Sequence, residues 1–147
     1  MLLDTRIRPT RPIDPGAARV HGWTLERLAD APGFPEVYPQ LAALIGSRPV
    51  VIYNADFDSR ILAQACALYR LPALDGAWHC AMRNYAAFHG TWNYDRNGFK
   101  WHKLVEACRS EHISVARAHG ALADCLLTLQ LVRSMAAWLE TDPEARG

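Results

Sequence analysis

A histidine and an aspartate stand five residues apart in the run AHGALADC, residues 118–125. An imidazole titrates near neutral pH and can move a proton, and a carboxylate can bind a hard metal ion. Five residues along an ideal helix correspond to a rotation of about 140°, so His119 and Asp124 cannot share a helix face. They can converge only if His119 precedes the helix, and Gly120, a poor helix former, favours a boundary there. The competing interpretation is an ordinary helix start with a solvated Asp124.

A second pair of carboxylates lies in the run VVIYNADFDSRIL, residues 50–62. Its β-branched stretch predicts a buried strand, and Asp56 and Asp58 follow where a helix begins. Open α/β sheets bind ligands at the carboxyl ends of their strands. If Phe57 packs against the sheet, Asp58 is turned about 100° away, toward the open end of the strand. The alternative is a capping role, because the helix dipole stabilises acidic residues in the first turn.

Length and composition describe one globular domain. The chain has 147 residues, half of them hydrophobic and 21% charged, which leaves room for a core. Fourteen of the sixteen basic residues are arginine, which suits bidentate phosphate contacts, although a biased base composition explains this equally well. No apolar run approaches the roughly 20 residues of a membrane helix, and the start lacks a signal-peptide core. We therefore expect a cytoplasmic protein with no membrane partner.

The cysteines indicate reduced thiols. They are widely scattered and never form a Cys-x-x-Cys pair: Cys66, Cys80, Cys108 and Cys125. This pattern predicts mostly buried, reduced side chains instead of a disulfide framework. A metal cluster is the alternative, because His79 adjoins Cys80 and His112 follows Cys108 by four residues, but no spacing repeats.

Hydrophobic periodicity predicts a layered α/β domain. Turns rich in proline, which exclude a helix, occupy residues 8–17, and a polar and aromatic loop occupies residues 91–98. The predicted strands are residues 2–7, 48–54 and a short one early in 79–90. The predicted helices are residues 24–30, 35–47 with Pro39 in the first turn, 55–71, the later part of 79–90 up to Gly90, 99–111 and about 120–140.

The ordered set of motifs resembles the DEDDh 3′–5′ exonucleases, proofreading-type enzymes similar to the polymerase III epsilon subunit. YNADFD resembles their second motif and HGALAD their third. VHGWTLERL (residues 20–28) is similar to their His-Gly-Ile-Thr segment, with Trp23 in place of the isoleucine. FKWHKLVEAC (residues 99–108) resembles the Lys-Leu helix that precedes the third motif. The resemblance implies an α/β, ribonuclease-H-like exonuclease fold with a mixed sheet flanked by helices, over residues 1–140, and a frayed tail at 141–147.

The resemblance also implies hydrolysis of phosphodiester bonds at a 3′ end of DNA or RNA, single-stranded or frayed, with two Mg²⁺ or Mn²⁺ ions. Asp58 and Asp124 would be metal ligands, and His119 would be the general base. Asn54 would position the site by hydrogen bonds. Three further residues would wedge or stack the terminal nucleotide: Val20, His21 and Phe57. Asp56 falls at a variable position of the family and is given no role. Tyr53 stands where the family more usually has histidine.

The family's first motif, an Asp-x-Glu on a central strand, does not precede YNADFD. Asp4-Thr5-Arg6 looks like Asp-Thr-Glu with arginine at the glutamate, but sixteen residues between Asp4 and His21 are too few for three strands. LLDTRIRPTRPIDP (residues 2–15) instead aligns with the family's third strand and its proline-rich tail. We therefore expect the chain to begin after the first two strands of the fold, as a fragment or through a misplaced start codon.

Three functions remain open. The first is an exonuclease, at least in the complete gene product; two acids and a histidine are too few to hold a metal pair tightly, which leaves the activity of this chain itself open. The second is a non-catalytic module that binds nucleic acid or a DNA polymerase, and the third is an α/β structural module. Another segment or a second copy of the chain would fill the gap in the sheet. The aromatic segment 91–101, with Arg96, Lys100 and Lys103, either contacts a single strand or is an ordinary surface loop.

Overall fold

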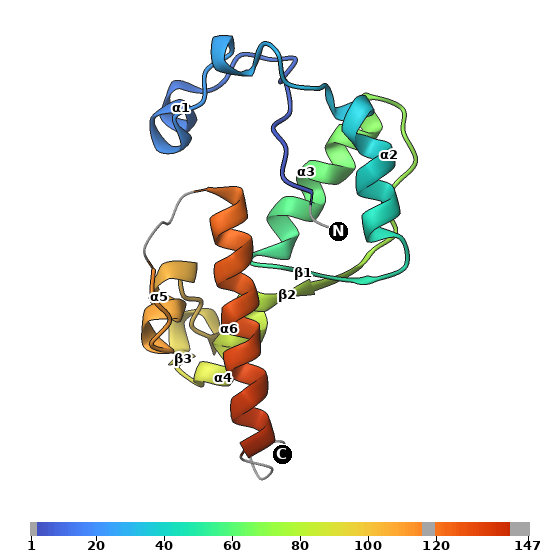
Figure 1. Cartoon of the computed structure of the whole chain (residues 1–147). Helices are drawn as coiled ribbons and strands as arrows, with labels where there is room; N and C mark the ends of the chain where they lie inside the picture. The colour runs from blue at the N-terminus through green and yellow to red at the C-terminus, as the bar shows by residue number, and fades with distance from the viewer. Residues whose placement is uncertain (1–2, 116–119, 142–147) are drawn as a thin grey trace. The chain divides into compact units, whose positions relative to one another are not determined.

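The computed structural model describes residues 3–115 and 120–141 (Figure 1). Its helices are α1 (Pro15–His21), η1 (Glu26–Leu28), α2 (Phe34–Ile45), α3 (Ala55–Leu68), α4 (Ala81–His89), η2 (Tyr94–Arg96), α5 (Leu104–Ser110) and α6 (Ala121–Thr141), where η marks a 3-10 turn. Its strands are β1 (Pro49–Ile52), β2 (Ala77–Cys80), β3 (Trp92–Asn93) and β4 (Gly98–Phe99). β1 pairs with β2, and β3 pairs with β4.

The chain divides into two compact units. Unit 1 is Met1–Val50 with Ser59–Ala77, and unit 2 is Val51–Asp58 with Trp78–Gly147. The first turn of α3 therefore belongs to unit 2, together with α4, α5 and α6. Beyond Thr141, the tail that was predicted to fray lies outside the described residues.

Helix α1 was not predicted, although signals at both of its ends are present in the sequence. The Asp14 side chain accepts a hydrogen bond from the Gly16 N–H at 2.8 Å, and Pro15 occupies a position where no N–H is needed. Gly22 closes the helix in the left-handed conformation, with φ 74°. The expectation that prolines exclude a helix from residues 8–17 was therefore wrong from Pro15 onward.

Two strand predictions need correction. Residues 3–7 form no strand, because none of the described strands pairs with them; the next residue, Arg8, donates its N–H to the Pro32 carbonyl at 2.9 Å. β1 lies where the β-branched run predicted it, but its burial alternates and Val51 remains 47% exposed. The strand is thus half-buried where a fully buried one was expected.

The predicted loop at residues 91–98 is a β-hairpin. β3 and β4 pair antiparallel, with Trp92 directly opposite Phe99, and η2 connects them. The Asn93 side chain accepts a hydrogen bond from the Arg96 N–H at 3.2 Å, and Asn97 takes the left-handed conformation with φ 47°. Strands of two residues are too short to show an alternating pattern, so periodicity could not reveal them.

Apolar spacing predicted most of the longer helices correctly. α2, α3, α4 and α6 lie where it placed them, and Gly90 ends α4 with φ 75°. Pro39 lies inside α2 instead of in its first turn. The helix predicted from Thr24 is only the single turn η1, and α5 begins at Leu104 instead of at Phe99, which belongs to β4.

The core of unit 1 is aromatic. The buried Phe34 ring stacks on Tyr69 at 5.9 Å between centroids and meets Tyr38 edge-on at 6.1 Å. The Tyr38 hydroxyl donates to the Pro72 carbonyl at 3.0 Å. These contacts hold α2 against α3 and the segment that follows it.

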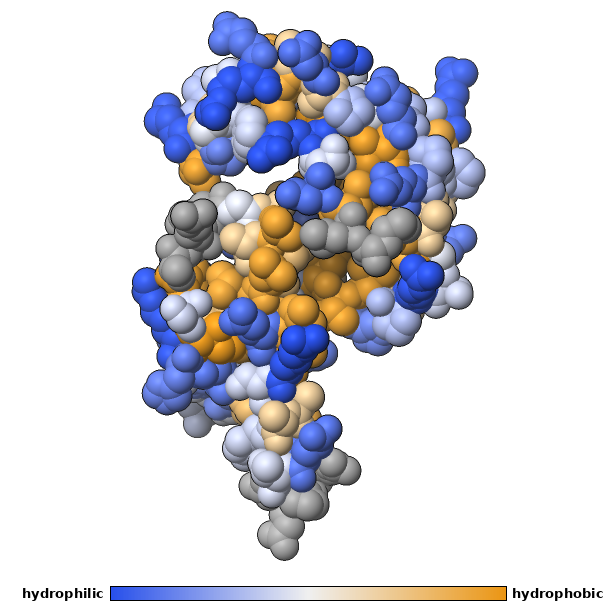
Figure 2. Space-filling view, viewed as in Figure 1, coloured by the Kyte–Doolittle hydropathy of each residue, from blue (hydrophilic) through white to orange (hydrophobic). Residues whose placement is uncertain are grey.

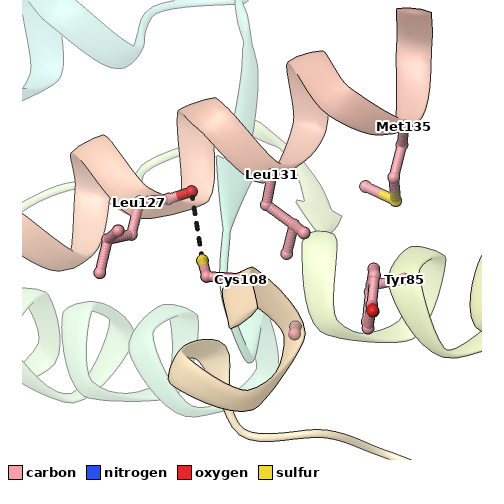
Figure 3. Close-up of a cluster of buried hydrophobic side chains, with 6 residues drawn as sticks. Tyr85, Cys108, Leu127, Leu131 and Met135 are labelled. Carbon is pink, nitrogen blue, oxygen red and sulfur yellow. Dashed lines mark hydrogen bonds between the residues drawn. The ribbon is translucent and has the colours of Figure 1, made fainter. Parts of the chain in front are cut away.

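The core of unit 2 lies between α4, α5 and α6 (Figure 3). Its buried members are Tyr85, Ala107, Cys108, Leu127, Leu131 and Met135. The Cys108 thiol contacts the Leu127 carbonyl at 3.8 Å, and the Tyr85 hydroxyl donates to the Glu111 carboxylate at 3.1 Å. One face of α6 is thereby packed against two other helices.

The four cysteines form no disulfide with one another. Cys66 and Cys108 are buried, and burial raises the pKa of both thiols. Cys125 is exposed, which the prediction of mostly buried cysteines did not anticipate for this position. The alternative metal clusters find no support in the described part of the chain, where no three histidine, cysteine or acidic side chains come together.

Helix α6 keeps large apolar side chains at the surface. Leu126, Leu129 and Trp138 are 50%, 45% and 45% exposed, and Figure 2 shows hydrophobic surface over the first part of this helix. By length and composition alone, α6 is the one described helix able to cross a membrane, so the expectation that no apolar run is long enough was wrong. A core helix passes the same test, and α6 packs Leu127 and Leu131 into the core of unit 2.

The His102 ring lies among aromatic neighbours in unit 2. Its centroid is 4.3 Å from that of His89 and 5.6 Å from that of Tyr85. Its Nε2 atom is buried and has no hydrogen-bond partner among the described residues. Burial, followed by the charges of His89 and Lys100, lowers the pKa of His102.

We expect His102 to make the free energy of unfolding fall in acid. Because the folded-state pKa of His102 is lowered, the unfolded chain binds more protons below its ordinary value of about 6.5. The stability is fully present above that pH and is lost as the pH falls toward the folded-state pKa. Urea unfolding is measured at about pH 7.5 and about pH 5.5, on either side of the ordinary value. Between these two pH values the free energy of unfolding should fall less in His102→Phe than in the wild type. His79→Phe, at an exposed position, should keep the wild-type loss, and equal losses in all three proteins would contradict the prediction.

Candidate functional site

Two half-buried carboxylates of unit 2 lie in the first turns of α3 and α6. They are Asp58, in α3 shortly after β1, and Asp124, in α6. α6 begins at Ala121, which confirms the helix boundary predicted at Gly120. Burial raises the pKa of Asp58, so its negative charge is held at a cost in free energy that a nearby cation would offset.

The predicted general base, His119, lies outside the described residues. Within residues 3–115 and 120–141, no group of three or more His, Cys, Asp or Glu side chains is placed to hold a metal ion. Asp58 and Asp124 are thus the two predicted ligands that the described residues include. Neither carboxylate forms an ion pair with another described side chain.

The neighbouring carboxylate, Asp56, is engaged elsewhere. It forms an ion pair with Arg83 of α4, and the two side chains are 64% and 55% exposed. Solvent screening limits such a pair to about 1 kcal/mol or less. Arg83 was not identified from the sequence, because nothing in local spacing indicates which residue of a distant helix will meet Asp56. Of the two acids of YNADFD, Asp56 thus forms an ion pair and Asp58 forms none in the described part of the chain.

Asn54 makes the turn from β1 into α3. It adopts the left-handed conformation, with φ 65°, and its carbonyl accepts the Phe57 N–H at 3.0 Å. Asparagine tolerates this conformation better than most residues. Phe57 is 50% exposed, so it does not pack wholly against the sheet, as the expected orientation of Asp58 assumed. Asn54, whose side-chain amide was predicted to position the site, therefore also forms the backbone turn between β1 and α3.

Two substitutions at Asn54 separate these roles. Asn54→Gly accepts a positive φ without strain and should keep the free energy of unfolding within about 0.5 kcal/mol of the wild type. Asn54→Ala should lower it by about 1–2 kcal/mol, because a Cβ without a compensating amide is strained there. Urea unfolding measures the difference. Nucleotide release then tests the amide, since both variants lack it; a Gly variant with wild-type activity would argue against a substrate contact.

Tyr53, which stands where the family usually has histidine, is tied into unit 2. Its hydroxyl donates to the His102 carbonyl at 2.8 Å, and its ring packs against the buried cluster. Burial raises the pKa of this phenol, so it stays a neutral donor. The sequence showed the replacement but not the partner, which lies 49 residues away.

Val20 and His21 belong to unit 1, in the last turn of α1, whereas Asn54, Phe57, Asp58 and Asp124 belong to unit 2. Val20 is 73% exposed, and His21 is exposed with its Nδ1 accepting the Trp23 N–H at 3.0 Å.

Trp23, the departure from the family's His-Gly-Ile-Thr segment, has its own structural explanation. The guanidinium carbons of Arg6 and Arg27 lie 4.3 Å and 4.9 Å from its ring centroid. Cations over a tryptophan ring are attracted by its electron-rich face. The tryptophan thus anchors the segment that follows α1.

Comparison with known proteins agrees with the motif order. A family model described as an exonuclease of the RNase T type matches residues 2–132. An uncharacterized exonuclease of Escherichia phage 186 is 39% identical over 144 residues, covering 92% of this chain and 73% of the phage protein. DNA polymerase III subunit epsilon of Pasteurella multocida is 50% identical over 52 residues, covering 35% of this chain and 21% of that subunit.

A solved structure shows the same fold. Exonuclease X, determined in complex with 5′ overhanging duplex DNA, matches with a TM-score of 0.67 and 27% sequence identity over 93% of this chain and 72% of its own. The predicted α/β, ribonuclease-H-like fold is thereby confirmed. The same relatives support hydrolytic nuclease activity. This chain belongs to the exonuclease family.

Proposed function

We propose that the chain carries part of the active site of a metal-dependent 3′–5′ exonuclease of the DEDDh type, acting on DNA or RNA. The observation that supports it best is that unit 2 contains two half-buried carboxylates, Asp58 in the first turn of α3 and Asp124 in the first turn of α6. Both lie in motifs of a chain that belongs to the exonuclease family.

The donor set suits a hard divalent cation. Mg²⁺ in proteins is often held by one or two carboxylates, with water and substrate phosphate completing its octahedral shell. Asp58 and Asp124 supply that number of carboxylates, and burial, opposed by a backbone hydrogen bond, raises the pKa of Asp58. Bound Mg²⁺ or Mn²⁺ would supply charge stabilisation at the scissile phosphate, and a two-metal site would need further carboxylates.

The remaining residues would bind and position the substrate. His119 would take the proton from the attacking water, as a general base, a role suited to an imidazole side chain. The Asn54 amide would donate or accept a hydrogen bond at the 3′ end. Phe57, which is 50% exposed, would contact the terminal nucleotide. The same contact for Val20 and His21, which belong to unit 1, stays a prediction from the resemblance.

The test is the polarity and metal dependence of strand shortening. A single strand labelled at its 3′ end should release labelled mononucleotide from the first turnover with Mn²⁺ and remain intact with EDTA. The same strand labelled at its 5′ end should shorten one nucleotide at a time and release its label last. Early release of the 5′ label would contradict the proposed direction.

A non-catalytic module that binds nucleic acid or a polymerase is the second candidate. Within residues 3–115 and 120–141 it is favoured by the absence of a group of three or more His, Cys, Asp or Glu side chains placed to hold a metal ion. One similar protein is named as a subunit of DNA polymerase III, which suggests the kind of partner. Equal, background release by the wild type and His119→Ala would select this function over the first. Either function suits a cytoplasmic protein.

A further inference from the structure

Four large aromatic side chains gather on one short segment of unit 2. Residues 91–103 contain four of them in thirteen positions, whereas aromatic residues make up 10% of the whole chain. Their exposed fractions are 43% for Trp92, 88% for Tyr94, 43% for Phe99 and 54% for Trp101. They are therefore not the buried anchors of an ordinary loop. Clustered aromatic surface that stays in water commonly marks an interaction site.

The hairpin holds these rings in a defined arrangement. Trp92 and Phe99 face each other across β3 and β4, with their rings edge-on and 5.3 Å apart between centroids. The Lys100 N–H donates to the Thr91 carbonyl at 2.8 Å and closes the base of the hairpin. Tyr94 begins the turn η2 at the other end. A preorganised surface of this kind loses little conformational entropy when a ligand stacks on it.

The charge on the same segment is positive. Residues 91–103 contain Arg96, Lys100 and Lys103, which include both lysines of the chain, against the single acid Asp95. All three basic side chains are exposed, and none forms an ion pair with another described residue. Exposed aromatic rings beside unpaired cations suit stacked bases and phosphates, because every base has a π-face and every linkage a negative charge. A second copy of the chain would bring like charges together and fits less well.

We propose that residues 91–103, called here the hairpin surface, bind single-stranded nucleic acid, with bases stacked on Tyr94 and Trp101 and phosphates paired with Arg96 and Lys100. The inference rests on the proposed function, since the bound strand would be the substrate of the exonuclease. It adds a contact to the strand on residues that belong to none of the motifs assigned to metal, water or the terminal nucleotide.

Strand binding without hydrolysis tests the hairpin surface directly. Fluorescence anisotropy of a labelled oligothymidylate of about 16 nucleotides, the upper site size for a single-strand module, is measured in EDTA. Tyr94→Ala should weaken binding about five- to tenfold, the lower part of the range for one stacked base. Lys100→Glu should weaken binding and make the slope of log K against log salt shallower by about 0.7. Thermal melts should match the wild type, since both side chains are exposed.

Matched controls use equivalent changes elsewhere in unit 2. Arg133→Glu makes the same charge change at an exposed position of α6, and Trp138→Ala removes an aromatic ring that is 45% exposed there. Both should keep wild-type binding. Affinity lost equally in the controls, or unchanged in Tyr94→Ala and Lys100→Glu, would overturn the inference. A change of oligomeric state in Tyr94→Ala without a loss of strand binding would overturn it in favour of self-association.

A second substrate separates this inference from the proposed function. A chromogenic ester of thymidine 5′-monophosphate is too small to reach a separate strand surface, so its hydrolysis with Mn²⁺ reports on the catalytic site alone. Strand binding that depends on Tyr94, without hydrolysis of the ester, would reject the exonuclease and retain the hairpin surface. Ester hydrolysis together with strand binding that Tyr94→Ala leaves unchanged would reject the hairpin surface and retain the exonuclease.

Discussion

Replacing Asp124 or Asp58 by asparagine is expected to reduce Mn²⁺-supported nucleotide release on the order of 10³-fold. The amide keeps the shape of the side chain but removes the negative charge that a divalent cation needs, and electrostatic stabilisation of this kind contributes several kcal/mol. His119→Ala should cost about 10²- to 10⁴-fold, the usual contribution of a general base. Initial rates on a 3′-labelled strand, at saturating Mn²⁺, measure all three variants.

The matched control is Asp56→Asn, two residues before Asp58 in the same motif. Asp56 is paired with Arg83 and is not a proposed ligand, so its loss removes only a screened surface ion pair. We expect its rate to stay within a few fold of the wild type. If Asp56→Asn lost as much activity as Asp58→Asn, the assignment of the two carboxylates would be wrong. If Asp58→Asn and Asp124→Asn kept wild-type rates, the proposed metal site would be wrong.

Truncating Leu131 to alanine is expected to lower the free energy of unfolding by about 2–5 kcal/mol. Leu131 is fully buried at the centre of the cluster that joins α6 to α4 and α5, so the change both removes apolar burial and leaves a cavity. A loss of this size is a large part of the roughly 5–15 kcal/mol that holds a domain folded. Urea unfolding monitored by circular dichroism measures it, and the melting temperature should fall on the order of 10 °C.

Leu129→Ala provides the control for this prediction. It makes the same chemical change two residues earlier in α6, where the side chain is 45% exposed. We expect a loss within about 0.5 kcal/mol, as for other surface positions. Equal destabilisation by the two substitutions would mean that α6 is covered on both faces in solution, and that the packing seen between α4, α5 and α6 is not what stabilises it.

Much of the candidate site was accessible from the sequence because its signals are local. Apolar spacing and the glycines at positions 90 and 120 predicted where α3, α4 and α6 begin or end, and so placed Asp58 and Asp124 in the first turns of two helices. Helical hydrogen bonds join residues four apart, so the pattern that forms a helix is contained within it. The order of YNADFD and HGALAD indicated the family that the comparisons then showed.

Local signals also explain the partial failures. The Asp14, Pro15 and Gly22 caps of α1 were present in the sequence, but the prolines before them dominated the interpretation. β3 and β4 are too short to alternate, and an extended segment such as residues 3–7 becomes a strand only where a partner exists. Short or unpaired elements therefore escaped prediction, while long periodic ones did not.

By itself, the sequence determined the family, the long helices and the motif positions of the two carboxylates. Only the tertiary structure decided that Asp56 pairs with Arg83, that Tyr53 bonds to the His102 carbonyl and that the aromatic rings of the hairpin stay in water. Each of these depends on which distant residues meet or which surface remains uncovered after packing. Spacing along a chain carries information about near neighbours, whereas contacts across 27 or 49 residues are chosen by how whole elements pack.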